Sequence, residues 1–344
     1  VPPSNINRDD TGSPKTAQYG GTRRARVSSQ AWKKAIRDYF NENGAQDNVG
    51  VRTLEVPQYI ANEITKLDPE RSQEDALQMA EKVINDANIK TQDGKTKALF
   101  FIGSEQAKAL AREALQGTED KKTLQAILNN NPAVDIALFG RMVADDPSLN
   151  EDASAQVAHA ISTHAVQTEF DFFTAIDDLQ PEDNAGAGML GTIEFNSSTM
   201  YRYANVAVHE LYRQLGDKEQ TLNALKLFIE AFANSLPTGK SNTFANQTLP
   251  QAILVTLRSD RPVNLVSAFE EPVKSSDGYV QKSIEKLFQE LKSVEKFVRK
   301  PDLTLYVTGH DVPDVDAENA EDGLTALLDS FYHAMDGLLS EKAE

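Results

Sequence analysis

The spacing of hydrophobic and polar residues predicts helices through most of residues 51–160. ERSQEDALQMAEKVIND and SEQAKALAREALQG place apolar residues three and four positions apart, and both begin near a Ser or Asp suited to an N-cap. DKKTLQAILNNN continues this pattern, whereas KALFFIG predicts a short strand. We also expect ASAQVAHAISTHAVQ to form a helix. This part of the chain is therefore expected to be largely helical.

The pattern changes between residues 166 and 206, where aromatic and β-branched residues dominate. TEFDFFTAIDDL and TIEFNSSTMYRYANVAV predict strands, and the intervening PEDNAGAGMLG is too long for a tight hairpin turn. We therefore expect a long β-ribbon with a glycine-rich tip. Beyond it the pattern predicts a helix over 207–234, the strand QAILVTLRS, the helix YVQKSIEKLFQELKSVEKFV, the strand DLTLYVTG and the helix GLTALLDSFYHAMDGLL.

Residues 19–40, YGGTRRARVSSQAWKKAIRDYF, predict a turn, a short strand and a helix. Ser28 and Ser29 supply oxygens that can cap the helix N-terminus. The helical period buries an aromatic stripe and presents polar side chains on the opposite face, namely Gln30, Lys33 and Arg37.

Charge is distributed unevenly along the chain. The net charge of −17 over 344 residues argues at first against nucleic-acid binding, because phosphates repel an acidic surface. Residues 1–37, here called the basic head, hold eight basic and two acidic residues, a net of +6. The remaining chain holds 27 basic and 50 acidic residues, a net of −23. The basic head is either a focused anion site or a set of solvated charges, and composition favours neither.

Composition excludes several classes of protein. A chain of this length can bury one large core or two to three smaller ones, and 40% hydrophobic residues is ordinary for a globular protein. The absence of cysteine excludes disulfides, thiolate metal sites and a cysteine nucleophile. No apolar run approaches the roughly 18 residues of a membrane-spanning helix. We therefore expect a cytoplasmic protein.

Two glycine motifs match nucleotide-binding patterns only in part. GAGMLG at 186–191 fits G-x-G-x-x-G, but a dinucleotide loop follows a strand and opens a helix, whereas strand-like residues follow Gly191 here. A dinucleotide oxidoreductase is therefore a weak alternative. GKS at 239–241 lacks the earlier glycine of a P-loop, which leaves Lys240 as a lone cation near a loop.

No residues assemble catalytic machinery with specificity. His159 and His164 would point roughly 140° apart on the predicted helix and could not easily chelate one metal ion. Asp177 and Asp178 are adjacent on a predicted strand and would face opposite sides. Structural histidines are the favoured interpretation. We expect no catalytic residue, no metal site and no cofactor.

Met189 and Leu190 are two large apolar residues in the predicted ribbon tip. Apolar side chains of this kind can wedge between bases and unstack them. They can equally tuck beneath a loop or meet a partner chain, and the sequence leaves both interpretations open.

Several motifs in one order resemble the backbone subunit of the type I-E CRISPR surveillance complex, the CasC family. They are NRDD at 7–10, GGTRRARVSSQAWKKAIR at 20–37, VDIALFGRM at 134–142, AHAISTH at 158–164, FTAIDDLQ at 173–180, LGTIEF at 190–195 and YRYANV at 201–206. The resemblance reaches at least SAFEEPVKSSDGYVQKSI at 267–284. Members have a strand before NRDD, whereas this sequence opens with VPPSNINRDD, and without that strand the palm would lack part of its sheet.

The resemblance implies an α+β fold with a palm of the RNA-recognition-motif (ferredoxin-like) type, a helical fingers insertion and a β-ribbon thumb. The implied boundaries are 1–50 for the first part of the palm, 51–165 for the fingers, 166–203 for the thumb, and 204–344 for the second part of the palm with C-terminal helices.

The resemblance also implies a non-catalytic subunit that polymerises along the CRISPR guide RNA (crRNA) as a helical filament. The palm and fingers grip the phosphate backbone, and each thumb displaces one base at regular intervals, so that the remaining guide can pair with target DNA. The implied partners are crRNA, copies of the same chain, other Cascade subunits and the recruited nuclease-helicase, with no membrane.

Site residues follow from the resemblance position by position. The positions that contact the guide fall on Arg8, Lys15, Ser28, Gln30, Lys33 and Arg37, and those that act on the displaced base fall on Met142 in the fingers and Leu190 at the thumb tip. The charge pattern adds Arg24, Arg26, Lys34 and Lys240. An alternative is a CRISPR RNA-processing endonuclease with an RNA-recognition-motif fold, using His159 or His164 as general acid or base.

Overall fold

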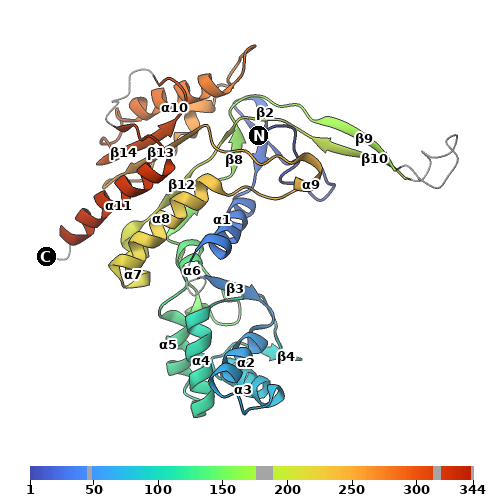
Figure 1. The fold of residues 1–344 in the computed structure, drawn as a ribbon, viewed down its shortest axis with the longest axis vertical. Helices are drawn as coiled ribbons and strands as arrows, with labels where there is room; N and C mark the ends of the chain where they lie inside the picture. The colour runs from blue at the N-terminus through green and yellow to red at the C-terminus, as the bar shows by residue number, and fades with distance from the viewer. Residues whose placement is uncertain (45–48, 176–188, 313–318, 342–344) are drawn as a thin grey trace. The chain divides into compact units, whose positions relative to one another are not determined.

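The computed structural model describes residues 1–44, 49–175, 189–312 and 319–341. The chain divides into two compact units. Unit 1 comprises Val1–Ile36, Val157–Ala204 and Ile229–Ala334, and unit 2 comprises Arg37–Gln156, Asn205–Phe228 and Met335–Glu344. Helices and antiparallel strands occur together, so the predicted α+β class is confirmed (Figure 1).

Antiparallel strands dominate unit 1. A four-stranded sheet has the order β1 (Thr16–Tyr19), β2 (Thr22–Val27), β8 (Ala160–Ser162) and β11 (Met200–Tyr201). A second pair joins β13 (Ala252–Leu257) to β14 (Leu303–Thr308). The ribbon predicted from the aromatic pattern is present as β9 (Glu169–Ala175) and β10 (Met189–Phe195), and it leads away from the four-stranded sheet (Figure 1).

Helices of unit 1 pack on these strands through two apolar clusters. The first joins Val27 of β2, Trp32 of α1 (Ser29–Asn43) and Ala160 of β8. The second includes Phe288 of α10 (Val280–Val294) and Tyr306 of β14, whose rings lie 5.1 Å apart. The remaining helices with residues in this unit are α8 (Lys218–Asn234), α9 (Ser241–Phe244), the 3-10 helix Leu265–Phe269 and α11 (Leu324–Glu341).

Unit 2 is mainly helical, as the spacing of apolar residues predicts. Its helices are α2 (Val56–Leu67), α3 (Gln73–Asp86), α4 (Ser104–Gln116), α5 (Lys121–Asn129), α6 (Val134–Phe139), the 3-10 helix Pro147–Leu149 and α7 (Val208–Leu215). Short strand pairs join β3 (Gly50–Thr53) to β6 (Phe100–Gly103), β4 (Thr91–Gln92) to β5 (Lys95–Thr96), and β7 (Ala155–Val157) to β12 (Ala204–Val206). The core residues Ile60, Ile64, Ile84, Leu110 and Leu124 are fully buried.

N-caps fix where two helices of unit 2 begin. Ser72 accepts a hydrogen bond from the amide of Asp75 at the start of α3, and Asp120 accepts one from the amide of Thr123 at the start of α5. Each side chain satisfies an amide that has no partner within its helix. Ser72 therefore confirms the predicted cap of α3. Helix α4 instead has Gly103 as its N-cap, and the Asp120 cap of α5 was not predicted.

The helix predicted over ASAQVAHAISTHAVQ is wrong. These residues form β7 and β8 instead, and β8 pairs with β2 through Arg26–Ile161 and Val27–Ala160. Alanine favours helices in isolation, but strand pairing on both edges of β8 decides its conformation. The angle of roughly 140° between His159 and His164 assumed this helix and is therefore also wrong.

The single helix predicted over 207–234 is two helices. Gly216 ends α7 in the left-handed conformation, with φ of 67°. The amide of Gly216 donates to the Tyr212 carbonyl, and α8 begins at Lys218. A left-handed glycine is the usual end of a helix, so Gly216 was the signal that the periodicity concealed.

Candidate nucleic-acid interface

The NRDD motif forms a tight, self-supported loop in unit 1. The Asp9 carboxylate accepts hydrogen bonds from the Thr11 hydroxyl and from the amides of Thr11 and Ser13. These bonds, that of the Thr11 hydroxyl first, lower the pKa of Asp9. Asn7 accepts from the amide of Ser28 at 2.8 Å and so ties the loop to the start of α1. The loop thereby holds the exposed side chain of Arg8 at the surface.

Strand β2 sends its arginines in different directions. Arg23 is exposed, whereas Arg24 is fully buried and donates to the carbonyls of Ser162 at 2.9 Å and Phe269 at 2.7 Å. Burial lowers the pKa of Arg24. Arg24 therefore binds the protein's own backbone, and its predicted contact with RNA stays a prediction.

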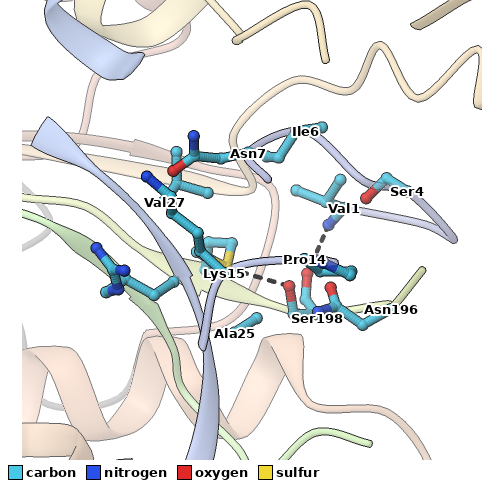
Figure 2. A pocket seen from close by; sticks show the side chains of 12 residues that line it. Val1, Ser4, Ile6, Asn7, Pro14, Lys15, Ala25, Val27, Asn196 and Ser198 are labelled. Carbon is cyan, nitrogen blue, oxygen red and sulfur yellow. Dashed lines mark hydrogen bonds between the residues drawn. The ribbon is translucent and has the colours of Figure 1, made fainter. Parts of the chain in front are cut away.

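A small pocket of unit 1 lies beside the same strand (Figure 2). Its cationic members are Lys15 and Arg26, and none of its lining residues is acidic. Arg26 donates through Nε to the Thr16 carbonyl at 3.2 Å, which orients its guanidinium. Figure 2 shows Lys15 next to Asn7 and Val27. Among the described residues, no carboxylate forms an ion pair with Arg8, Lys15 or Arg26.

Helix α1 buries the predicted apolar stripe, whereas its predicted outer face is only partly present, because Arg37 packs on Asp135 and Phe101. Trp32, Ile36 and Phe40 are buried, while Gln30 and Lys34 are exposed and Lys33 is half-buried. Ser28 is itself buried, and its hydroxyl accepts from the Ala31 amide at 3.3 Å, which confirms the predicted N-cap.

Arg37 is committed to unit 2. Its Nε lies 2.8 Å from the carboxylate of Asp135, which is fully buried, and its Nη2 donates to the Gly50 carbonyl at 3.2 Å. The guanidinium also lies 4.4 Å from the Phe101 ring centre. Burial raises the pKa of Asp135, and the Arg37 hydrogen bond opposes that rise. The side chain of Arg37 keeps 19% exposure, and its predicted contact with RNA is not tested by this geometry.

Met142 is held outward by its neighbour. Arg141 is buried and donates to the carbonyls of Leu149 at 2.9 Å and Leu128 at 2.8 Å. Burial lowers the pKa of Arg141 to about 10. Since adjacent side chains of an extended segment point to opposite sides, Met142 faces solvent and is 86% exposed. An unbranched apolar side chain in water is suited to contact with a flat partner such as a base.

Leu190 lies on a face of the β9–β10 ribbon that combines apolar residues with Thr174, Thr192 and Glu194. It pairs with Thr174 and is 65% exposed. Thr192, two residues on, pairs with Phe172, so Leu190 and Phe172 share one face, together with Phe170. The two phenylalanines are 67% and 65% exposed. Sequence reasoning named only the tip, although the alternation EFDFF already predicted this aromatic face.

Other predicted residues are placed as follows. Lys240 is half-buried in the left-handed conformation, with φ of 52°, just before α9. Gly191 is followed by further strand in β10, so no helix opens after the GAGMLG motif. Gly186, Gly188, Asp177 and Asp178 lie outside the described residues.

The two central histidines differ in environment. His164 is buried, its Nδ1 bonds the Ala165 carbonyl at 2.8 Å, and its Nε2 accepts from the Thr199 amide at 3.1 Å. Its ring also stacks on Tyr279. His164 is therefore the structural histidine that the sequence favours, whereas His159 is exposed and contacts Arg26.

The described residues show neither a metal-binding cluster nor a membrane-spanning helix. Within the described ranges, no three His, Asp or Glu side chains gather as a metal site. Among the helices that the structure describes, none has the length and apolar character needed to cross a bilayer.

Solved structures share this mixed α+β fold. A chain of the structure titled "CRISPR RNA-guided surveillance complex, pre-nicking" superposes with a TM-score of 0.85 at 32% identity, covering 97% of each chain. A chain of the structure titled "CRISPR RNA-guided surveillance complex" gives a TM-score of 0.64 at 30% identity, covering 97% of this chain and 95% of that one. The chain is thus homologous to subunits of such complexes.

The sequence family is defined by a second comparison. The family model described as CT1975-like protein matches residues 1–331, and the chain belongs to that family. A comparison with curated proteins gives no match.

Proposed function

We propose that this protein is a non-catalytic, crRNA-binding backbone subunit of a CRISPR RNA-guided surveillance complex of type I-E. In this proposal unit 1 contains a palm of the RNA-recognition-motif type, and copies of the chain assemble along the guide as a filament. Target DNA is reached through pairing with the guide, and other subunits and a nuclease-helicase complete the assembly. The homology to subunits of such complexes over nearly the whole chain supports this proposal.

The observation that carries the proposal is a set of three cations of unit 1 that form no ion pair with a described carboxylate. Arg8, Lys15 and Arg26 lie at or near the surface without a described carboxylate partner, in a protein of net charge −17. Such cations cost little when they face a polyphosphate, because the phosphates supply the missing counter-charges. Helix α1, which begins beside the Asn7–Ser28 hydrogen bond, adds the exposed side chains of Gln30 and Lys34 and the half-buried Lys33.

The apolar residues give the proposal its second part. Met142 and Leu190 each expose a large apolar side chain, the first next to the hydrogen-bonded Arg141 and the second in the paired strand β10. Contact with unstacked bases would remove these side chains from water while the cations hold the backbone. The expected role of each residue is to contact a displaced nucleotide.

Salt-dependent RNA binding tests the proposal. We expect Arg8→Ala with Lys15→Ala to weaken binding of a single-stranded repeat RNA and to reduce the slope of log K against log salt by about 1.4, which is about 0.7 for each lost phosphate contact. The matched control is Lys97→Ala with Lys122→Ala, which removes the same charge from exposed positions of unit 2. Equal losses in both pairs would contradict the proposal.

The endonuclease alternative is tested with the same RNA. His164 has both ring nitrogens engaged by backbone groups, which leaves no nitrogen to transfer a proton to substrate. We therefore expect precursor repeat RNA to be recovered intact after incubation. Cleavage products that disappear in His159→Ala would replace the binding role with a catalytic one.

A further inference from the structure

The pairing of β2 with β8 places His159 near the pocket lined by Lys15 and Arg26. Val27 of β2 pairs with Ala160 of β8, so residue 159 lies beside the end of β2. Arg26 Nη1 and His159 Nδ1 are 3.1 Å apart. The contact joins residues 133 positions apart, and the helix expected from the sequence could not have produced it.

The contact with Arg26 fixes the tautomer of His159. A guanidinium has donors only, so His159 Nδ1 must accept the hydrogen bond. The neutral ring then carries its proton on Nε2. Because His159 is exposed, the Nε2–H group is available to a ligand in solvent.

The charges around His159 are all positive. Burial first, then Arg26 of β2 and Lys15 before β1, lower the pKa of His159. No acidic group contributes to this shift, and the pocket that Lys15 and Arg26 line contains no acid. The fold therefore holds two cations close to a neutral histidine, and a shared anion would offset the repulsion between the cations and favour the protonated ring.

We propose that Lys15, Arg26 and His159 form one phosphate-binding site, in which His159 Nε2 donates to a phosphate oxygen. When the phosphate binds, His159 Nδ1 takes up a proton from solvent, its hydrogen bond with Arg26 breaks, and the freed Arg26 N–H donates to the phosphate. This inference rests on the proposed function, because the phosphate belongs to the guide RNA backbone. It adds His159 as a binding residue, and it makes RNA affinity depend on pH.

The direction of the pH dependence follows from the charges. In the free protein, Arg26 and Lys15 disfavour the imidazolium, and a bound phosphate favours it. Binding therefore takes up a proton, and affinity rises as pH falls through the interval between the free and bound pKa of His159. One proton permits at most a tenfold change in affinity for each pH unit.

The test compares the full-length chain with His159→Gln. Glutamine retains a donor near the position of Nε2 but does not titrate in this range. We expect both proteins to bind single-stranded RNA within about threefold of each other at pH 8, and wild-type affinity to rise about three- to tenfold more than that of the variant by pH 5.5. His209→Gln, a change of an exposed histidine on α7, is the matched control and should leave the pH dependence unchanged.

A second measurement separates the site from the proposed function. The His159 titration is followed by NMR of its ring nitrogens, alone, with sulfate as a non-titrating phosphate substitute, and with RNA. An upward shift of the titration midpoint in sulfate and RNA supports the site, and a shift in sulfate alone assigns it to a free anion rather than to the guide. Identical pH slopes for wild type and His159→Gln, or an unmoved midpoint, would overturn the site while leaving RNA binding intact. Absence of RNA binding at every pH would reject the proposed function, and the sulfate titration would then decide the site by itself.

Discussion

The binding partners of single side chains in this protein cannot be read from their residue type. Arg24 and Arg37 were both predicted to contact RNA, yet the first binds backbone carbonyls and the second binds a buried carboxylate. His159 was predicted to be structural, yet it is exposed beside Arg26. The position of each charged group in the fold, rather than its type, therefore determines which residues can meet a ligand.

The pH dependence of stability is predicted from His164. Burial, the largest cause, lowers the pKa of His164 in the folded protein below the ordinary histidine value of 6.5. The unfolded chain then binds the proton first, so stability is complete above pH 6.5 and is lost as pH falls towards the folded pKa. We expect the free energy of unfolding of His164→Gln, measured by thermal unfolding, to change less between pH 6.5 and 5 than that of wild type. The difference is up to about 1.4 kcal/mol per pH unit.

Two outcomes would bear on this prediction. His333→Gln alters an exposed histidine on α11 and should retain the wild-type pH profile. A wild-type profile in His164→Gln would show that another group controls stability in acid.

Arg202 gives a second prediction at this scale. Its guanidinium lies between Trp32 and Phe232, 3.5 and 4.3 Å from the ring centres, and its buried Nε and Nη2 have no acceptor among the described residues. Burial lowers the pKa of Arg202 to about 9. Removing a buried charge that lacks a counter-ion is often neutral when volume is kept, so Arg202→Met should stay within about 1 kcal/mol of wild type.

Lysine serves as the comparison for Arg202. Arg202→Lys keeps the charge but loses the planar stacking, and we expect a loss of about 2 kcal/mol, measured by thermal unfolding. A lysine variant more stable than the methionine variant would show that the charge is neutralised by a group not yet identified.

At the scale of elements, local sequence determines helix faces and ends more reliably than strand identity. The buried stripe of α1, the cap of α3, and the strands β13 and β14 follow from the pattern. β8 does not, because its partners β2 and β11 come from distant parts of the chain. Where an element has only three residues, pairing outweighs propensity.

The break between α7 and α8 allows a clean test of backbone conformation. Gly216 has φ of 67°, and a Cβ there would meet no atom within 4 Å, so Gly216→Ala changes conformational energy alone. We expect a loss of about 1 kcal/mol, seen as a lower thermal midpoint. Gly337 of α11 also has space for a Cβ but has an ordinary helical backbone. Gly337→Ala should therefore raise the free energy of unfolding by about 0.5–1 kcal/mol and with it the thermal midpoint. Shifts of the same sign would contradict the conformational argument.

For the whole molecule, charge separation is the property that the proposed function uses. The basic head carries +6 and the remaining chain −23. We expect the net negative charge of the remaining chain, here called the acidic body, to repel polyanions and so to limit binding to unrelated nucleic acid. Long-range repulsion of this kind weakens as salt rises.

Neutralising part of the acidic body tests this consequence. Glu70, Glu74 and Glu219 are exposed in unit 2. Their combined change to Gln should raise affinity for random DNA at low salt, by less than about tenfold, while guide RNA binding changes little. Filter binding at two salt concentrations measures both quantities. Unchanged affinity for random DNA would remove selectivity as a role of the acidic body.

The sequence by itself determined the mixed helical and strand composition, the apolar faces of the helices, the β-ribbon and the concentration of positive charge near the N-terminus. These features depend on residues that are close together along the chain, so the sequence alone contains the information that determines them. Only the tertiary structure decided that Arg24 turns inward, that Arg37 pairs with Asp135 across 98 residues, and that His159 meets Arg26. Each of these contacts requires chain segments that only folding brings together, because burial and hydrogen bonding act between neighbours in space.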